Sequence, residues 1–132
     1  MISINRQTEY ALFLIAYLHG RKKHTPLSKI SKTSGLSLGL LSRVASVLSS
    51  EGILDSQEGA GGGYVLDVKP EKITMYEIMS LFEPDRRIVS CLDSEGSCSC
   101  LKDCPLKTFW TNLECEFEKK LKKIKISQIL SR

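Results

Sequence analysis

Residues 53–66 read Ile-Leu-Asp-Ser-Gln-Glu-Gly-Ala-Gly-Gly-Gly-Tyr-Val-Leu: a short run, a glycine-rich turn and a second, more apolar run. Both runs are typical of strands, and the glycines between them favour a flexible tip. A phosphate-binding loop would need Gly-Lys-Ser or Gly-Lys-Thr at the start of a helix, whereas Tyr64 opens a strand here. The stretch therefore predicts a β-hairpin and not a nucleotide site.

Two short helices are predicted just before this hairpin. Thr25-Pro26 is typical of a helix start, with Thr25 as the N-cap and Pro26 at the first helical position. Gly35 breaks that helix, and Ser37 is expected to cap a second helix over residues 38–50. Two helices joined by a glycine-containing turn occur in many all-helical domains, but a hairpin directly after them favours a winged helix-turn-helix.

The second of these helices has an apolar and a polar face. Its buried stripe is expected to comprise Leu41, Val44, Val47 and Leu48. The polar face is the candidate DNA-reading surface, because the second helix of a helix-turn-helix enters the major groove. Arg43, its one basic side chain, is the best candidate for reading a guanine edge. The predicted DNA-binding residues are Ser37, Gly39, Leu40, Ser42, Arg43 and Ser46, with Gly59 and Gly61 of the wing.

The rest of the chain is mostly helical in pattern. An apolar face over residues 4–19 predicts a first helix, and Thr74 with Glu77 forms a capping box for a helix over 73–82. From Pro105 an amphipathic helix of about five turns is expected. Its apolar seam comprises Phe109, Leu113, Phe117, Leu121 and Ile124. Such a helix needs a partner, most simply its own copy in a homodimer.

Composition sets bounds on function. The net charge of +4 and the pI near 8.8 permit nucleic-acid binding without demonstrating it. No run approaches the ~20 apolar residues of a membrane span, so we expect a cytoplasmic protein without a membrane partner. Residues 21–24, Arg-Lys-Lys-His, form a basic loop, which the sequence favours as merely solvated. Neither His19 nor His24 has an evident nucleophile partner, so no enzyme is expected.

Four of the five cysteines lie within residues 91–104, here called the cysteine segment: Cys91, Cys98, Cys100 and Cys104. The residues between them are mostly polar or small and cannot hold the segment by burial, which suggests a metal. A disulfide framework would need an oxidising compartment, and the N-terminus has no apolar secretory core. Zinc and an iron–sulfur cluster both remain open from the spacing alone. Cys115, outside the segment, is interpreted as a packing residue.

These features together resemble a known family. Residues 30–37 (Ile-Ser-Lys-Thr-Ser-Gly-Leu-Ser), the glycine-rich wing, the cysteine segment and the helix containing Trp110 are similar to the IscR/NsrR/CymR (Rrf-two) family of bacterial transcription regulators. The resemblance covers nearly the whole chain. It implies a homodimeric winged-helix protein bound to double-stranded operator DNA, and an iron–sulfur cluster (2Fe-2S or 4Fe-4S) that senses redox, nitric oxide or iron–sulfur status.

The resemblance also implies a ligand set. The family spacing is Cys-x5-Cys-x5-Cys, which Cys98 and Cys104 match, whereas Cys91 lies one residue further from Cys98. Cys100 is an additional thiol that could replace Cys98 or act as a fourth ligand. Some relatives use an acidic residue of the partner's first helix, and Glu9 stands at that place.

Two departures from the family pattern are visible. Lys107 stands where some relatives place a histidine ligand, and it is a poor ligand while charged. Glu58 stands where the family wing often has an arginine, and phosphate would repel it.

The expected fold is therefore mainly α with a small β wing. Residues 1–83 are expected to form a winged helix-turn-helix domain, residues 84–104 a cluster-binding loop, and residues 105–132 a dimerisation helix and tail. The expected function is a transcriptional regulator whose DNA affinity is controlled by the cluster. The alternative is a zinc-stapled or thiol-switch adaptor that acts through protein partners.

Overall fold

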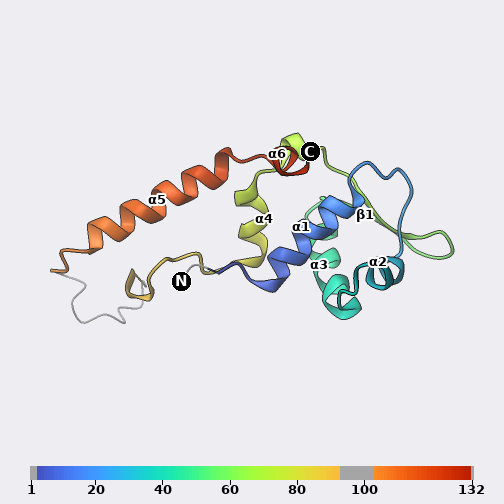
Figure 1. The fold of residues 1–132 in the computed structure, drawn as a ribbon, viewed down its shortest axis with the longest axis horizontal. Helices are drawn as coiled ribbons and strands as arrows, with labels where there is room; N and C mark the ends of the chain where they lie inside the picture. The colour runs from blue at the N-terminus through green and yellow to red at the C-terminus, as the bar shows by residue number, and fades with distance from the viewer. Residues whose placement is uncertain (1–2, 93–102, 132) are drawn as a thin grey trace.

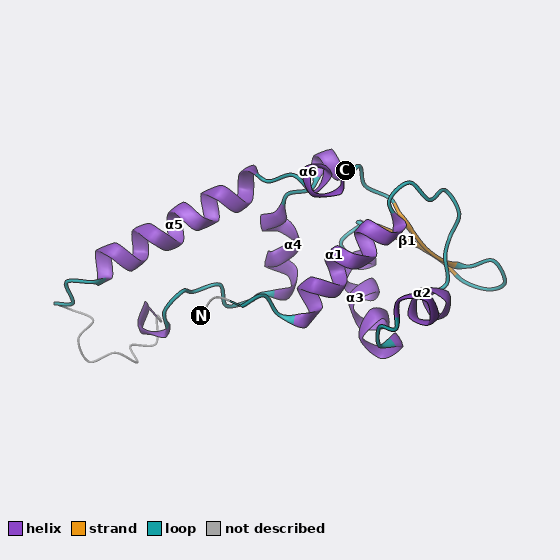
Figure 2. Cartoon of the chain, in the orientation of Figure 1, coloured by secondary structure: helices purple, strands orange, loops and turns teal. Residues whose placement is uncertain are grey.

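The computed structural model describes residues 3–92 and 103–131. The described elements follow the order α1 (Arg6–Leu18), α2 (Leu27–Ser34), α3 (Leu38–Ser50), β1 (Leu54–Gln57), β2 (Gly63–Leu66), η1 (Pro70–Lys72), α4 (Met75–Phe82), η2 (Ser90–Leu92), α5 (Lys107–Lys123) and α6 (Ile126–Leu130). The wing lies at one end of the molecule and α5 extends at the other (Figures 1 and 2). The expectation of a mainly α fold with a small β wing is confirmed. No described helix is long and apolar enough to cross a membrane.

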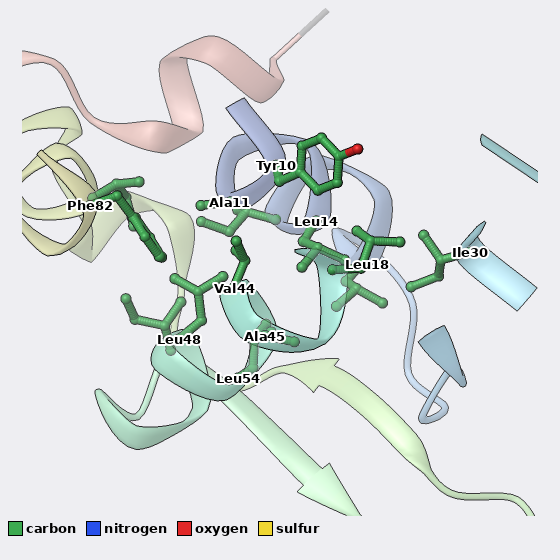
Figure 3. Close-up of a cluster of buried hydrophobic side chains, with 14 of the residues drawn as sticks. Tyr10, Ala11, Leu14, Leu18, Ile30, Val44, Ala45, Leu48, Leu54 and Phe82 are labelled. Atoms are coloured by element: carbon green, nitrogen blue, oxygen red, sulfur yellow. The ribbon is translucent and has the colours of Figure 1, made fainter. Parts of the chain in front are cut away.

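The core forms where α1 packs against α3, with α2, α4 and β1 around them (Figure 3). Side chains of α1 and α3 at this contact, including Leu14, Val44 and Leu48, have no exposed surface. Burying each such side chain stabilises the fold by roughly 1.5–3 kcal/mol. The predicted stripe of α3 is confirmed except for Val47, which is only partly buried, while Ala45 is fully buried instead.

The turn between α2 and α3 has the predicted chemistry. Gly35 ends α2 in the left-handed conformation (φ 73°), which glycine adopts without strain. The Ser37 hydroxyl accepts a 3.4 Å hydrogen bond from the Leu40 amide and so caps α3. The Ser37 amide in turn donates to the Tyr10 hydroxyl of α1 at 3.1 Å. The start of α3 is therefore attached directly to α1.

The wing is an antiparallel hairpin in which Leu54 pairs with Leu66 and Gln57 with Gly63. The loop before α2 joins it as a third, one-residue strand, because Thr25 and Tyr64 exchange two backbone hydrogen bonds of 2.9 Å. The prediction that Thr25 caps α2 is therefore wrong: Pro26 occupies the N-cap position, and Thr25 pairs with the wing. Tertiary pairing has overridden a local helix-start signal.

Gly63 permits this close approach. Its φ is 128°, and a Cβ there would lie 2.2 Å from the Thr25 carbonyl carbon and oxygen. No side chain fits without moving backbone atoms. Gly61, at the tip, has a φ of 77° but open space around its Cα.

We expect Gly63→Ala to destabilise the protein by about 2–3 kcal/mol, because it adds a backbone clash to conformational strain. Gly61→Ala, the matched control, should cost only about 1 kcal/mol from strain alone. Chemical denaturation of both variants measures the difference. Equal free energies of unfolding would show that the contact between the wing and Thr25 contributes nothing.

The C-terminal elements return to the DNA-binding domain. Thr74 and Glu77 form the predicted capping box of α4. After α5 the chain runs antiparallel to the start of α4, with 2.9 Å backbone hydrogen bonds from the Met75 amide to Ile124 and from the Ile126 amide to Ile73. Ile126 is 2% exposed and belongs to the main core. The chain after α5 thus folds back onto the core as α6.

Candidate DNA-binding surface and cysteine segment

The outer face of α3 carries most of the predicted DNA-reading residues. Ser37, Gly39, Ser42, Arg43 and Ser46 are all exposed along it. Leu40 is only partly buried and packs against the core, so part of its side chain remains accessible. Sequence reasoning missed Leu38, whose side chain is 46% exposed in the first turn of α3. Its position directly after the Ser37 cap and outside the predicted buried stripe could have indicated that Leu38 is exposed.

The tip of the wing continues this surface. Gly59 and Gly61 are exposed, and both have positive φ angles (89° and 77°) that suit glycine. Glu58 is also exposed. Residues 37–66 contain one basic side chain, Arg43, against three acidic ones, Glu51, Asp55 and Glu58. The formal charge of residues 37–66 is therefore negative, and phosphate would repel it.

The structure describes only the two ends of the cysteine segment. Cys91 lies in η2 and Cys104 lies just before α5; both are free thiols with intermediate exposure. Cys98 and Cys100 lie outside the described residues. Within residues 3–92 and 103–131, no three His, Cys, Asp or Glu side chains form a group that could hold a metal ion.

Glu9, the remaining candidate ligand, and Lys107, a poor ligand while charged, lie in different helices. Glu9 lies in the first turn of α1 and is exposed, and Lys107 opens α5. Cys115 is also exposed on α5, so the packing role expected for it is not seen within one chain.

A partly buried polar cluster anchors residues 84–90, here called the linker, which lead to the cysteine segment. The Glu83 carboxylate, at the end of α4, accepts hydrogen bonds from the backbone amide of Asn5 (2.7 Å) and from the Thr8 hydroxyl (2.9 Å). The Asn5 side chain donates to the carbonyl of Phe82 and caps α1 by accepting from the Thr8 amide. Thr8 is completely buried. The linker therefore starts from a point attached to the N-terminus of α1.

Further along, the linker is attached to α5. The Ile88 amide donates a 2.6 Å hydrogen bond to the Glu114 carboxylate. A cavity of about 460 Å³ separates the linker from α5 and is lined by Pro84, Asp85, Arg86, Arg87, Leu92, Glu114, Phe117, Glu118 and Leu121. Hydrogen bonds from Arg87 lower the pKa of Asp85 to about 2. Asp85 therefore stays ionised at any physiological pH.

Charged side chains from the linker and α5 pack around Tyr76 of α4. Arg86 and Lys122 lie over the Tyr76 ring, 4.8 and 4.6 Å from its centroid. Lys122 also pairs with Glu118 at 2.7 Å. Hydrogen bonds from Lys122 and Tyr76 lower the pKa of Glu118, and the bond to Glu118 raises the pKa of Lys122. These contacts hold the C-terminal half of α5 against α4.

The first half of α5 exposes apolar side chains. Leu106, Phe109 and Leu113 are 55%, 56% and 37% exposed, and Phe109 packs edge-on against Trp110 with 4.9 Å between ring centroids. In the described part of α5 only Leu121 is buried. The long amphipathic helix is thus as predicted, with an apolar face open to a partner.

Together, the helix-turn-helix, the wing and the long C-terminal helix define a class: DNA-binding transcriptional regulators of the winged-helix type. Comparison with known proteins identifies the family. The family model Rrf2, described as an iron-dependent transcriptional regulator, matches residues 4–132. This chain belongs to the Rrf2 family.

Curated relatives have the same role. The HTH-type transcriptional regulator IscR of Aliivibrio salmonicida is 30% identical over 113 residues, which span 86% of this chain and 67% of that protein. A putative HTH-type transcriptional regulator of Aquifex aeolicus is 29% identical over 125 residues, which span 92% of this chain and 87% of that protein. The expectation of a regulator and not an enzyme is therefore confirmed.

Solved structures share the fold. CymR, the global cysteine regulator of B. subtilis, has a TM-score of 0.75 and 26% identity, covering 99% of this chain and 98% of its own. A putative transcriptional regulator from Listeria innocua has a TM-score of 0.79 and 26% identity, covering 98% and 87%. IscR of T. potens, with a TM-score of 0.70 and 23% identity over 98% of this chain and 86% of its own, supports the fold alone.

The Glu83 cluster makes a testable contribution to stability. Glu83→Ala removes the shorter of the two hydrogen bonds of the buried Thr8 hydroxyl (2.9 Å to Glu83, 3.2 Å to the Asn5 side chain) and the acceptor of the Asn5 backbone amide, so we expect a loss of about 1–3 kcal/mol in the free energy of unfolding. In a Thr8→Val background the same substitution should cost less, because the hydroxyl is already absent. A double-mutant cycle by chemical denaturation measures this coupling. Additive effects would contradict the proposed contact.

Proposed function

We propose that this regulator controls its operator affinity through an iron–sulfur cluster (2Fe-2S or 4Fe-4S) held by the cysteine segment. Cys91, Cys98 and Cys104 are the proposed ligands, with Cys100 and Glu9 as candidates for the remaining position. The signal is the cluster's redox state, nitric oxide or iron–sulfur supply. The observation that carries the proposal is the anchoring of the segment: its linker is tied to α1 through Glu83 and to α5 through Glu114.

The donor chemistry fits such a cluster. Thiolates are its usual ligands, and Cys91 and Cys104 are free, partly buried thiols at the two ends of the segment. A bound cluster would supply iron–thiolate bonds that tie these two ends together. Cys104 lies three residues before the start of α5, and its carbonyl accepts a 3.3 Å hydrogen bond from the Lys107 amide. A change at Cys104 would therefore act on the first turn of α5.

The proposed assembly is a homodimer formed through α5. The exposed side chains of Leu106, Phe109 and Leu113 offer an apolar face that a second copy would cover. In a dimer the orientation of α5 would set the distance between the two copies of α3, and half-site spacing depends on that distance. The division of labour follows: residues 1–83 bind DNA, residues 84–104 hold the cluster, and residues 105–132 dimerise.

A thiol switch is the second candidate. It is favoured by the similarity to CymR, which is described as a cysteine regulator, and by the free thiols of Cys91 and Cys104. A zinc-stapled adaptor would use the same thiols with a colourless metal. Metal content separates the three.

The first experiment is anaerobic purification followed by visible absorbance and analysis of iron, sulfide and zinc. We expect coloured protein with matched iron and sulfide, and loss of both in Cys104→Ser. Cys115→Ser, the matched control outside the segment, should keep the cluster. In a DNA-shift assay on the promoter of its own gene, the holo and apo forms should differ in affinity. Equal affinities would refute the sensor, and stoichiometric zinc would support the adaptor.

Arg43 provides the test of base reading. Arg43→Ala should weaken binding to the operator by ~1–3 kcal/mol and relax specificity at one base pair. Arg43→Lys keeps the charge but loses the bidentate geometry, so it should recover affinity for scrambled DNA more than affinity for the operator. Titration of both duplexes measures the two effects. Recovery of full operator affinity by lysine would show that Arg43 contacts only phosphate.

A further inference from the structure

The basic loop at residues 21–24 is exposed at Arg21, Lys22 and Lys23 and is attached to the wing at its C-terminal end. It leads into Thr25, which pairs with Tyr64 of β2, and the His24 ring lies 2.8 Å from the Asp55 carboxylate of β1. The loop is thereby attached to both strands of the wing. In Figure 1 it runs from the end of α1 to the start of α2, beside the wing.

The charge distribution is uneven around this loop. From residue 10 to residue 50 the chain has six basic side chains and no acidic one. Five of the six lie in the loop and in α2: Arg21, Lys22, Lys23, Lys29 and Lys32. The reading helix and the wing, by contrast, carry more acidic than basic residues. The positive charge therefore lies beside the wing, not on it.

The side chains of this patch surround a concave surface. A depression of about 390 Å³ is lined by residues 21–26 and by Lys29, on the exposed side of α2. Arg21 is fixed in place, because its Nε donates to the Tyr17 carbonyl at 2.9 Å and its guanidinium lies 4.4 Å from the Tyr17 ring centroid. Lys22, Lys23 and Lys29 are exposed, and no acidic side chain in the described part of the chain pairs with them.

We propose that Lys22, Lys23 and Lys29 bind backbone phosphates of the DNA and supply the charge that α3 and the wing lack. The first helix of a helix-turn-helix crosses the DNA backbone, and α2 is that helix here. An ammonium group suits a phosphate as a mobile point charge without base preference. The inference rests on the DNA-binding role of the family and is independent of the cluster.

Salt dependence tests the proposal, because each neutralised phosphate contributes about 0.9 to the slope of log affinity against log salt concentration. The probes are the promoter duplex of the protein's own gene and a scrambled duplex of equal length. The proteins are the wild-type full chain, Lys22→Gln/Lys23→Gln, Lys29→Gln, and the control Lys119→Gln/Lys123→Gln. The control changes the net charge equally, at exposed positions on α5.

Because each homodimer carries every substitution twice, we expect Lys22→Gln/Lys23→Gln to lower the slope by about 3.6, and Lys29→Gln by about 1.8, on both duplexes. The ratio of wild-type affinity to double-variant affinity should then fall roughly a hundredfold between about 50 and 200 mM salt. The preference for the promoter over the scrambled duplex should not change. The control should keep the wild-type slope, and all melting temperatures should agree.

Three outcomes would overturn the proposal. If the lysine variants have the same slope as the control, the lysines do not neutralise phosphates, and the patch would suit an acidic protein partner instead. If the lysine variants lose the preference for the promoter duplex but keep the wild-type slope, the lysines act by maintaining the conformation of the wing. A wild type that binds neither duplex would overturn both this inference and the proposed function. Equal affinity of holo and apo forms, by contrast, would refute only the sensor, because the slopes can be measured on either form.

Discussion

The packing of α1 against α3 is the constraint on which the rest of the structure depends. Leu14, Val44 and Leu48 meet there without exposed surface, and the Tyr10 hydroxyl holds the first turn of α3 through Ser37. Because the inward face of α3 is fixed by burial, its serines and Arg43 must face outward. The same α1 helix receives Glu83 from α4 at its N-terminus. One helix therefore contacts the DNA-reading element and the start of the linker.

The wing carries little charge of its own but fixes the position of charged neighbours. Its glycines leave a tip without a basic residue, and Gly63 lets the backbone of Thr25 approach as a third strand. That pairing brings the lysines of the preceding loop to the edge of the wing. A strand pairing, which has no sequence specificity of its own, thus decides where the positive charge of this domain lies.

Hydrogen bonds attach the linker, which leads to the cysteine segment, to α1 and α5. Its two anchors are hydrogen bonds to carboxylates, from Asn5 and Thr8 to Glu83 and from Ile88 to Glu114. Hydrogen bonds to charged groups are stronger than neutral ones, yet they can exchange with water when partly exposed. Because Glu83 and Ile88 both precede Cys91, these contacts attach the N-terminal end of the cysteine segment to α1 and α5.

The sequence by itself determined the local elements: the capping box of α4, the serine cap of α3, the glycine that ends α2, the hairpin and the amphipathic α5. Each of these depends on residues within a few positions of one another, where side-chain periodicity and cap chemistry act directly. Only the tertiary structure decided that Thr25 pairs with the wing and not with its own helix, that Ala45 replaces Val47 in the core, and that Glu83 receives Thr8. Thr25 and Tyr64 are 39 positions apart in the sequence, and Thr8 and Glu83 are 75 apart, so no local pattern could predict these contacts. Long-range packing and hydrogen bonding stabilise one of several conformations that the local sequence permits.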